Sequence, residues 1–597
     1  MRRRVLLTAL GVAAVLAVAA LGFGVLGHST QAASAVPTGT LKFNISFSNS
    51  LSTTPISGRV FVIVSTSNAD EPRLLADDGG VTDTVPFFGK NITDMMPGSP
   101  VTLDDSMDVY GYPLVSVDDL PAGDYYVQAL LNVYTTFNRS DGSVVSLHMP
   151  GGDGNDLFVS PGNLVSTPVR LHLDPAAGGT FDLQLDQVLP PLQPVPPGGT
   201  TQQGNPTDSM HVKHIKIQSK LLSEFWGQPM YIGANILLPK GYDAKHSKRV
   251  HYPVIWHQTH FPSRNPFGFV EDQSNAFSQW WMSKDAPQVI VVEIRHENPY
   301  FDDSYAVNSA NLGPYGDAIT EELMPAVDKA FRTIDKRWAR TITGGSTGGW
   351  ETIAQQVFYP KLYSGAWIFY PDPLDFHFHQ LIDIYDDANA YFTQHEWVTV
   401  DRPSAREVSG DIMYTMVQEN HWELALGTQG RSGLGQWDIW QAVYGPEGAD
   451  GYSAPIWDKV TGVIDHTVAQ QWLPMDLDNY VTTNWSTLGP LLSDRLFFFV
   501  GTADTYFLNN AVQLFQQNTD QLTDPATGWS FDYGVNQPHG YSPYTNQELI
   551  TIMAQYMADQ APRGHHTGHW LPPGVTHHVK GHASHSHAAT TGRDHRH

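Results

Sequence analysis

The chain has 597 residues, with 60 acidic and 34 basic side chains, a formal charge of −26 and no cysteine. The acidic balance disfavours a general nucleic-acid binder, because neutralising phosphates needs an excess of Lys and Arg. Without cysteine, the chain has no disulfide, no thiolate metal site and no cysteine nucleophile. A content of 41% hydrophobic residues can bury a large core, which excludes global disorder, and the length predicts more than one domain.

The first 35 residues have the pattern of an export signal peptide. Arginines at positions 2 to 4 precede an uncharged stretch over 5–27, and the small residues at 32–35 match an A-x-A cleavage site. An uncleaved membrane anchor is the alternative, since the apolar stretch approaches the length that spans a bilayer. Both interpretations predict a secreted or extracytoplasmic protein, with membrane contact only if the segment is uncleaved.

Residues 38–188 are predicted to form short strands separated by turns. Residues 41–47 alternate apolar and polar side chains, which is the period of a half-buried strand. Repeated segments of this kind without a helical pattern indicate an all-β, sandwich-like domain. The other strand-like segments are 59–64, 125–131 and 169–173.

A Pro- and Gly-rich segment over 189–209 predicts a stiff, exposed linker. After it, over 210–562, short β-rich runs such as 252–256 and 288–294 alternate with helical patterns. Strand, helix and strand in succession predict a doubly wound parallel sheet with helices on both faces. One apolar helix face is formed by side chains that recur every four residues, namely Ile319, Leu323, Val327 and Phe331.

A G-x-S-x-G pattern spans residues 344–348, with Ser346 at its centre. A β-rich segment at 341–343 precedes the serine, and a helix-compatible stretch at 350–358 follows it. This order is typical of a strand–turn–helix elbow that exposes a nucleophilic serine. In such an elbow the backbone N–H of Thr347 points toward the reaction centre, where it can stabilise an oxyanion.

A serine nucleophile needs a base, and the base needs an orienting carboxylate. In enzymes with this elbow, the acid follows the serine and the histidine comes last. Asp504 follows an apolar strand at 496–500, and His539 follows a later strand at 529–533. Both are therefore predicted at carboxyl ends of strands, where open α/β sheets place functional groups. The alternative acids, after an earlier strand near 366–370, are Asp372 and Asp375.

The residues around the serine resemble a known family. Gly313-Pro-Tyr-Gly-Asp-Ala-Ile-Thr-Glu-Glu-Leu-Met-Pro325, the pair Phe331-Arg332 and the run 344–349 are similar to the putative-esterase family of α/β-hydrolases. That family includes S-formylglutathione hydrolases, feruloyl esterases, enterochelin-esterase-like proteins and mycolyltransferases. The resemblance extends over roughly 210–560 and implies a Ser-Asp-His esterase. The family's catalytic places fall on Ser346, Asp504 and His539.

The chain departs from this family at one turn. After the third strand the family usually has an apolar run that ends in His-Gly and supplies the second oxyanion N–H. Here the sequence is Trp256-His-Gln-Thr-His-Phe-Pro262, which has no glycine at the turn. The candidate second donors are therefore the backbone N–H groups of His260 and Phe261.

A large insertion, at about 376–490, separates the strands near 366–370 and 496–500. Its many aromatic side chains could line a cap pocket for an aryl, acyl or sugar group, but most are expected to form the core of the cap itself. Three residues that end another strand are further candidates to face the pocket: Arg295, His296 and Glu297. The aromatic residues are Trp397, Tyr414, Trp422, Trp437, Trp440, Tyr444, Trp457, Trp472 and Trp485.

Two polar segments carry side chains that bind metals. Residues 563–597 form a histidine-rich tail that is expected to be disordered, either with adventitious affinity for divalent metals or as a plain polar tail. Its candidate ligands are His565, His566, His569, His577 and His578. A turn with Asp153, Asn155 and Asp156 has calcium-binding oxygens, although a polar turn is the simpler interpretation. The sequence shows no phosphate loop, Rossmann fingerprint or H-E-x-x-H motif, so no cofactor is expected.

Together these patterns predict a secreted serine hydrolase that cleaves carboxylic esters through an acyl-enzyme on Ser346. The substrate is a small-molecule or polymer-borne ester. An acyltransferase would use the same triad with an alcohol in place of water. A non-catalytic envelope or binding protein on a hydrolase scaffold is the third hypothesis. The altered oxyanion turn favours it, while the presence of all three triad residue types argues against it.

Overall fold

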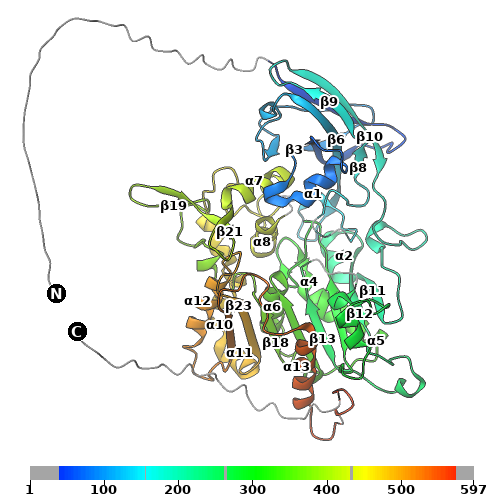
Figure 1. The fold of residues 1–597 in the computed structure, drawn as a ribbon, viewed down its shortest axis with the longest axis vertical. Coiled ribbons are helices and arrows are strands. Elements are labelled where there is room, and N and C mark those ends of the chain that lie inside the picture. The colour runs from blue at the N-terminus through cyan, green and yellow to red at the C-terminus, as the bar shows by residue number, and fades with distance from the viewer. Residues whose placement is uncertain are drawn as a thin grey trace, which may run out of the picture.

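The computed structural model describes residues 39–152, 154, 156–260, 265–430, 435–565 and 567–572. Two units, each built on a large sheet, follow one another along the chain (Figure 1). The predicted export signal lies outside the described residues. Among the helices that are described, none has both the length and the apolar character needed to cross a bilayer.

The N-terminal unit is built on a ten-stranded sheet. Its strands follow the order β4-β1-β10-β8-β6-β2-β3-β5, with β7 and β9 paired to β6. The strands are β1 (Leu41–Phe47), β2 (Ile56–Ser65), β3 (Phe87–Met95), β4 (Val101–Leu103), β5 (Tyr110–Tyr112), β6 (Gly123–Asn138), β7 (Val144–His148), β8 (Leu164–Ser166), β9 (Val169–Leu173) and β10 (Gly179–Val188). The predicted alternation is confirmed in β1, which buries every second side chain.

The N-terminal unit is not all-β, because helix α1 (Pro72–Asp83) packs against the sheet. The sequence signal for it was local: Pro72 stands in the first turn, where its fixed φ suits a helix start and its missing N–H is not needed. Ala76 is buried against the sheet face that carries Phe61 and Ile63. A short, weakly periodic helix of this kind is easily overlooked beside strong strand patterns.

The second unit contains an eight-stranded sheet in the order β11-β12-β14-β13-β17-β18-β23-β24. Strands β11 and β12 are antiparallel additions, and from β14 to β24 every neighbouring pair is parallel. This confirms the predicted parallel sheet over most of its width. The strands are β11 (Val212–Ser219), β12 (Met230–Leu237), β13 (Val254–Gln258), β14 (Ile290–Arg295), β17 (Arg340–Gly345), β18 (Ala366–Phe369), β23 (Leu496–Gly501) and β24 (Ser530–Gly534).

Helices cover both faces of this sheet (Figure 1). One core is shared by the strands with α5 (Met324–Ala330), α6 (Thr347–Phe358) and α12 (Asn509–Thr519), and the other with α3 (Ala276–Trp281) and α13 (Asn546–Asp559). The predicted helix face is present for Ile319, Leu323 and Val327, with its first part wound as a π-helix over Ala318–Leu323, whereas Phe331 follows the end of α5 in extended backbone.

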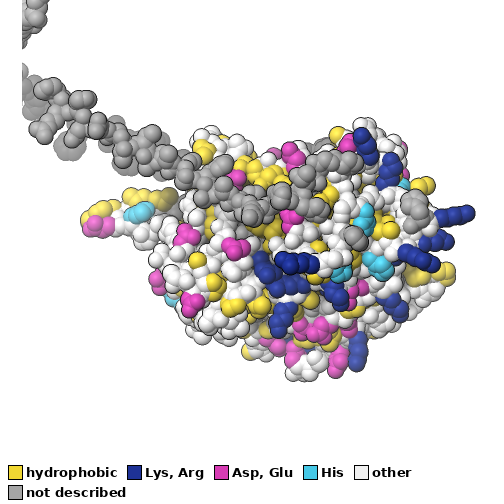
Figure 2. Space-filling view, turned by 90° about the horizontal axis from the view of Figure 1, so that it is seen from below, with side chains coloured by type: hydrophobic (Ala, Val, Ile, Leu, Met, Phe, Trp, Pro, Cys, Tyr) yellow, Lys and Arg dark blue, Asp and Glu magenta, His cyan; other side chains and the backbone are white. Residues whose placement is uncertain are grey.

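The segment between β18 and β23 contains a folded insertion. Its expected aromatic core is present, since Trp437, Trp440, Trp457 and Trp472 are all at most 2% exposed. The insertion includes β19 (Phe392–Gln394), β20 (Thr399–Asp401), β21 (Pro403–Arg406), β22 (Ile412–Thr415), α7 (Met416–Gly427), α8 (Gln436–Tyr444), α9 (His466–Ala469), α10 (Leu477–Thr483) and α11 (Trp485–Leu492). The β19–β20 hairpin projects from the body (Figures 1 and 2) and carries Trp397, which is 86% exposed.

The insertion also contacts the N-terminal unit. Arg59 on β2 is fully buried and donates from Nε and Nη2 to the carbonyl of Ala425 on α7, at 3.1 and 2.7 Å. Phe61 and Ile63 on the same strand share a core cluster with Ala425 and Leu426. Burying a guanidinium is unfavourable unless its donors are satisfied, so this contact ties the two units together at a defined point.

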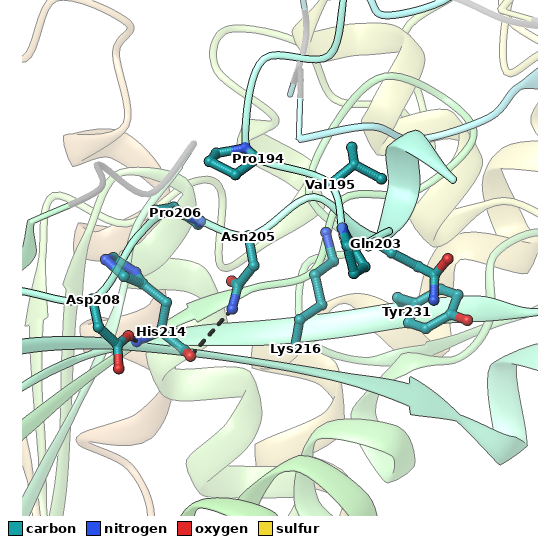
Figure 3. Close-up of a pocket in the computed structure, with 10 residues that line it drawn as sticks. Pro194, Val195, Gln203, Asn205, Pro206, Asp208, His214, Lys216 and Tyr231 are labelled. Atoms are coloured by element: carbon teal, nitrogen blue, oxygen red, sulfur yellow. Dashed lines mark hydrogen bonds between the residues drawn. The ribbon is translucent and has the colours of Figure 1, made fainter. Parts of the chain in front are cut away.

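The predicted linker has many exposed residues, but part of it contacts the edge of the sheet. Arg295, at the end of β14, donates to the side chains of Gln193 and Asn205, and Asn205 in turn donates to the carbonyl of His214 on β11. Linker and sheet edge border an open hollow of about 560 Å³ (Figure 3). Its walls include Pro194, Pro206, Lys216 and Tyr231.

Candidate active site

Ser346 lies at the turn between β17 and α6, as the elbow predicts. Its backbone has φ 59° and ψ −126°, a conformation that non-glycine residues rarely adopt. Its N–H donates to the carbonyl of Phe369 at the end of β18 (3.1 Å), which holds the turn in place. The side chain remains partly exposed, so the hydroxyl is available to a reactant.

The glycines of the pattern allow two chain segments to approach closely. A Cβ on Gly344 would lie 2.6 Å from the carbonyl oxygen of Gln258, and one on Gly348 would lie 2.4 Å from the same atom. Contacts this short with backbone are not tolerated by any larger residue. The end of β13 therefore passes directly beside the elbow because both positions lack a side chain.

The three predicted triad side chains lie in one hydrogen-bonded chain. His539 Nε2 lies 3.0 Å from Ser346 Oγ, and His539 Nδ1 lies 2.9 Å from Asp504 Oδ2. Asp504 is fully buried, and its other oxygen accepts the backbone N–H groups of Tyr506 (3.0 Å) and Leu508 (3.2 Å). These distances are those expected between a nucleophile, its base and the orienting acid.

Two tyrosines flank the imidazole of His539. The ring of Tyr370 lies 4.7 Å and that of Tyr506 lies 4.9 Å from the imidazole, both in edge-to-face geometry. Burial, reinforced by the charge of Asp504, raises the pKa of the Tyr370 hydroxyl, and burial also raises that of Tyr506. Both hydroxyls therefore remain protonated at neutral pH.

The predicted oxyanion donors lie in two places. Thr347 is the first residue of α6, where backbone N–H groups have no partner within the helix. The turn after β13 passes the same helix end, since Thr259 N lies 3.0 Å from where a Gly348 Cβ would stand. His260 follows on this turn, whereas Phe261 lies outside the described residues.

The side chain of His260 forms a second His–Asp pair. Its Nε2 lies 2.8 Å from Asp302 Oδ1. Burial alone would lower the pKa of His260, but the charge and hydrogen bond of Asp302 outweigh that effect and raise the pKa to about 9. His260 is therefore a cation at neutral pH, and no sequence pattern predicts its pairing with Asp302.

The two alternative acids have other partners. Asp372 accepts hydrogen bonds from Tyr305 OH (2.8 Å) and Thr347 Oγ1 (3.1 Å). Asp375 caps a turn by accepting the backbone N–H of His377, and also contacts that imidazole at 2.7 Å. The carboxylate that reaches His539 Nδ1 is that of Asp504.

A buried polar group that the sequence did not predict lies beside the elbow. His296, Asp303 and Glu351 bring three possible metal-ligand atoms within 4.8 Å of one another. However, Nδ1 of His296 accepts the N–H of Ser304 (3.1 Å), so the neutral ring carries its proton on Nε2, which faces Glu351 at 3.7 Å. Burial raises the pKa of Glu351 well above its usual range. At 3.7 Å the contact between His296 Nε2 and Glu351 is longer than a hydrogen bond, and Nε2 and both Glu351 carboxyl oxygens are buried without a hydrogen-bond partner among the described residues.

The remaining candidates are resolved in part. Arg295 faces the linker rather than the site. Asp156 accepts the N–H groups of Phe158 and Val159, which makes it a turn residue, while Asp153 and Asn155 lie outside the described residues.

In the tail, His565 lies against Trp338, and Trp570 is buried by stacking on the same ring. The start of the tail is thus packed, because it carries an apolar residue among its histidines. His569 lies against Trp570, whereas the other predicted tail ligands, His566, His577 and His578, lie outside the described residues.

Comparison with known proteins finds similarity over part of the chain. Residues 228–422 match the model described as "Putative esterase". A 142-residue stretch is 28% identical to an endo-1,4-beta-xylanase/feruloyl esterase of Xylanibacter ruminicola, covering 22% of this chain. The match spans only 18% of the length of that relative.

Solved structures with similar folds include two hydrolases. A fluorophosphonate-binding serine hydrolase of Staphylococcus aureus is 14% identical, with a TM-score of 0.32, and covers 58% of this chain and 98% of its own. An S-formylglutathione hydrolase from Agrobacterium tumefaciens is 11% identical, with a TM-score of 0.31, and covers 60% of this chain and 95% of its own.

Proposed function

We propose that the protein hydrolyses carboxylic esters through an acyl-enzyme on Ser346, a proposal that the match of residues 228–422 to the putative esterase model supports. The observation that carries this proposal is the hydrogen-bonded chain from Ser346 through His539 to the buried Asp504. A serine hydroxyl is a weak nucleophile unless a positioned base removes its proton, and this chain supplies that base.

In the first half of the proposed reaction, Ser346 Oγ attacks the ester carbonyl while His539 Nε2 takes its proton. The imidazolium then protonates the alkoxide of the leaving alcohol, and an acyl-enzyme remains. Asp504 keeps the His539 proton on Nδ1 and stabilises the charged ring. In the second half, His539 takes a proton from water, the hydroxide attacks the acyl-enzyme, and Ser346 regains its proton as the acid leaves.

The tetrahedral intermediates need donors for their negative oxygen. The Thr347 N–H at the start of α6 is suited to this role, because the helix leaves it unpaired and places the positive end of its dipole there. The turn after β13, which runs beside the same helix end, is the proposed source of the second N–H, from His260 or Phe261.

For the substrate we propose an ester outside the cytoplasm, small or attached to a polymer. The basic and apolar N-terminal pattern supports export. The relative named a feruloyl esterase and the two tyrosine rings beside His539 make aryl-acyl esters the first class to test.

The proposal is tested by labelling the purified protein with a fluorophosphonate probe and locating the adduct by peptide mass spectrometry. We expect one adduct, on Ser346, and its loss in Ser346→Ala. Ser409→Ala, which removes an exposed serine of the insertion, is the matched control and should label fully. Folded protein that forms no adduct would contradict the proposal.

A panel of acetyl, long-chain acyl and feruloyl esters then separates the remaining alternatives. Release of free acid assigns hydrolysis. Labelling with transfer of the acyl group to an added alcohol, but without free acid, would assign an acyltransferase instead. Neither labelling nor turnover in folded protein would favour the non-catalytic binding protein.

A further inference from the structure

Asp372 is a buried carboxylate beside the nucleophile that the proposed reaction does not use. Four donors converge on its Oδ2: Tyr305 OH (2.8 Å), Thr347 Oγ1 (3.1 Å), Trp440 Nε1 (3.2 Å) and Gln436 Nε2 (3.4 Å). They come from three separate parts of the chain: the loop after β14, the first turn of α6, and α8 of the insertion. Asp372 thus joins the elbow to the insertion.

The contacts of Asp372 are inaccessible to bulk water. Asp372 is 3% exposed, Trp440 1%, and Tyr305 and Thr347 are fully buried. A carboxylate in such surroundings is costly unless donors compensate it, and hydrogen bonds to a charged acceptor are stronger than neutral ones. Burial raises the pKa of Asp372, while the hydrogen bond of Tyr305 and the charge of His260 oppose that rise.

The residue before Thr347 is also tied to this strand end through its backbone. The Asp372 N–H donates to the carbonyl of Ser346 (3.3 Å), and the Ser346 N–H donates to the carbonyl of Phe369 (3.1 Å). Thr347 is therefore held at its backbone through Ser346 and at its hydroxyl by Asp372, while the Tyr305 OH, which donates to the same carboxylate, lies 3.1 Å from Thr347 Oγ1. This is the residue whose N–H is proposed to bind the oxyanion.

We propose that Asp372 is a positioning residue that fixes Thr347, and with it the oxyanion-binding N–H, to helix α8 of the insertion. The inference rests on the proposed function, because it assigns Asp372 a part in the same reaction. This role of Asp372 makes the insertion a structural component of the reaction centre. Trp440 and Gln436 of the insertion donate to the same carboxylate that holds Thr347, so removing either donor alters the position of Asp372.

The first test is Asp372→Asn, which keeps the shape but replaces the charged acceptor with a neutral amide. We expect kcat to fall about 10- to 100-fold, because a displaced oxyanion donor acts on the transition state. KM should change less than about threefold, since the interaction is made only in the transition state.

The second test separates positioning from general stability at Thr347. Thr347→Val is nearly isosteric but has no hydroxyl to donate, and it should lower kcat as Asp372→Asn does. Thr347→Ser keeps the hydroxyl and should restore kcat to within about threefold of wild type. The double variant of Asp372→Asn and Thr347→Val should lose little more than either single change, because both remove the same contact.

The third test concerns the insertion. Trp440→Phe removes the N–H and keeps a ring, whereas Trp457→Phe is the matched control, because Trp457 is equally buried in the insertion but donates to Asn420 Oδ1 (3.0 Å). A lower kcat is expected in Trp440→Phe only. Equal loss in both variants, or equal loss in the Val and Ser variants of Thr347, would overturn the inference.

Amide hydrogen exchange over residues 346–350 measures the same linkage without turnover. Asp372→Asn should accelerate exchange in this segment, and Trp457→Phe should not. Unchanged exchange together with unchanged kcat would overturn the inference. A wild-type protein that neither labels nor hydrolyses would overturn the proposed function instead, and the exchange result would then decide the linkage alone.

Discussion

Replacing the buried acid of the triad tests the proposed chemistry most directly. In Asp504→Asn, one oxygen must still accept two backbone N–H groups, from Tyr506 and Leu508. The amide oxygen will take that place, because an NH2 group there would face two donors. The NH2 group then faces His539 Nδ1, which must accept, so the imidazole proton moves to Nε2 and points at Ser346 Oγ.

In that tautomer His539 cannot take the serine proton. We expect kcat to fall about 10⁴-fold, the size of loss found when a triad acid becomes an amide, which corresponds to about 5 kcal/mol of barrier. Unfolding should change little, since both backbone donors keep a partner. The assay is initial-rate hydrolysis of an aryl ester beside a urea melt, with the exposed Asp520→Asn as control. A loss below tenfold in a folded Asp504→Asn protein would refute the reasoning.

Three further predictions concern pH and stability. The pKa of His260 is raised from 6.5 to about 9, so its pair with Asp302 stabilises the fold fully below about pH 6.5 and loses that effect as pH rises through 9. Between pH 6.5 and 9, the free energy of unfolding measured with urea should therefore fall less in H260Q than in the wild type, by at most about 3 kcal/mol. Parallel pH profiles of the two proteins would contradict this prediction. Arg59→Met leaves the Ala425 carbonyl unpaired and should cost about 1–3 kcal/mol in urea unfolding, with faster proteolysis between the two units. Lys459→Met leaves the buried carboxylates of Glu423 and Asp438 without their cation. Thermal unfolding should therefore show that the free energy of unfolding falls by about 3–5 kcal/mol, and an unchanged melting temperature would contradict this prediction.

The residues of the proposed triad could be predicted because each has a local signal. Glycines surround Ser346, Asp504 follows a fully apolar strand, and His539 follows a shorter strand in which apolar and polar residues alternate. The order serine, acid, histidine along the chain then reduces the number of residues that could serve as the acid and the base. The relative positions of the three side chains depend on strands β17, β18, β23 and β24. These strands follow one another in the sequence and are also neighbours in the sheet.

The parts that could not be predicted depend on contacts between distant segments. Asp372 has the sequence context of an alternative acid, and only the approach of Tyr305 and Trp440, 67 and 68 positions away, gives it other partners. The linker shows the same limit, since its composition predicts exposure, but Arg295 lies 90 or more positions from the linker side chains that it contacts. Composition records local preference and carries no information about such pairings.

The contact between β2 and α7 has a consequence for how the chain is made. Arg59 and Ala425 are 366 positions apart, so an emerging chain completes the N-terminal sheet long before the helix that covers one of its faces exists. Until then the face that carries Phe61, Ile63 and Phe87 is covered only in part, by α1 and Phe158 of the same unit, and the part that α7 later buries is an apolar surface of the kind that promotes aggregation. Any truncation upstream of α7 would retain this surface permanently, so the N-terminal unit is expected to be poorly soluble by itself.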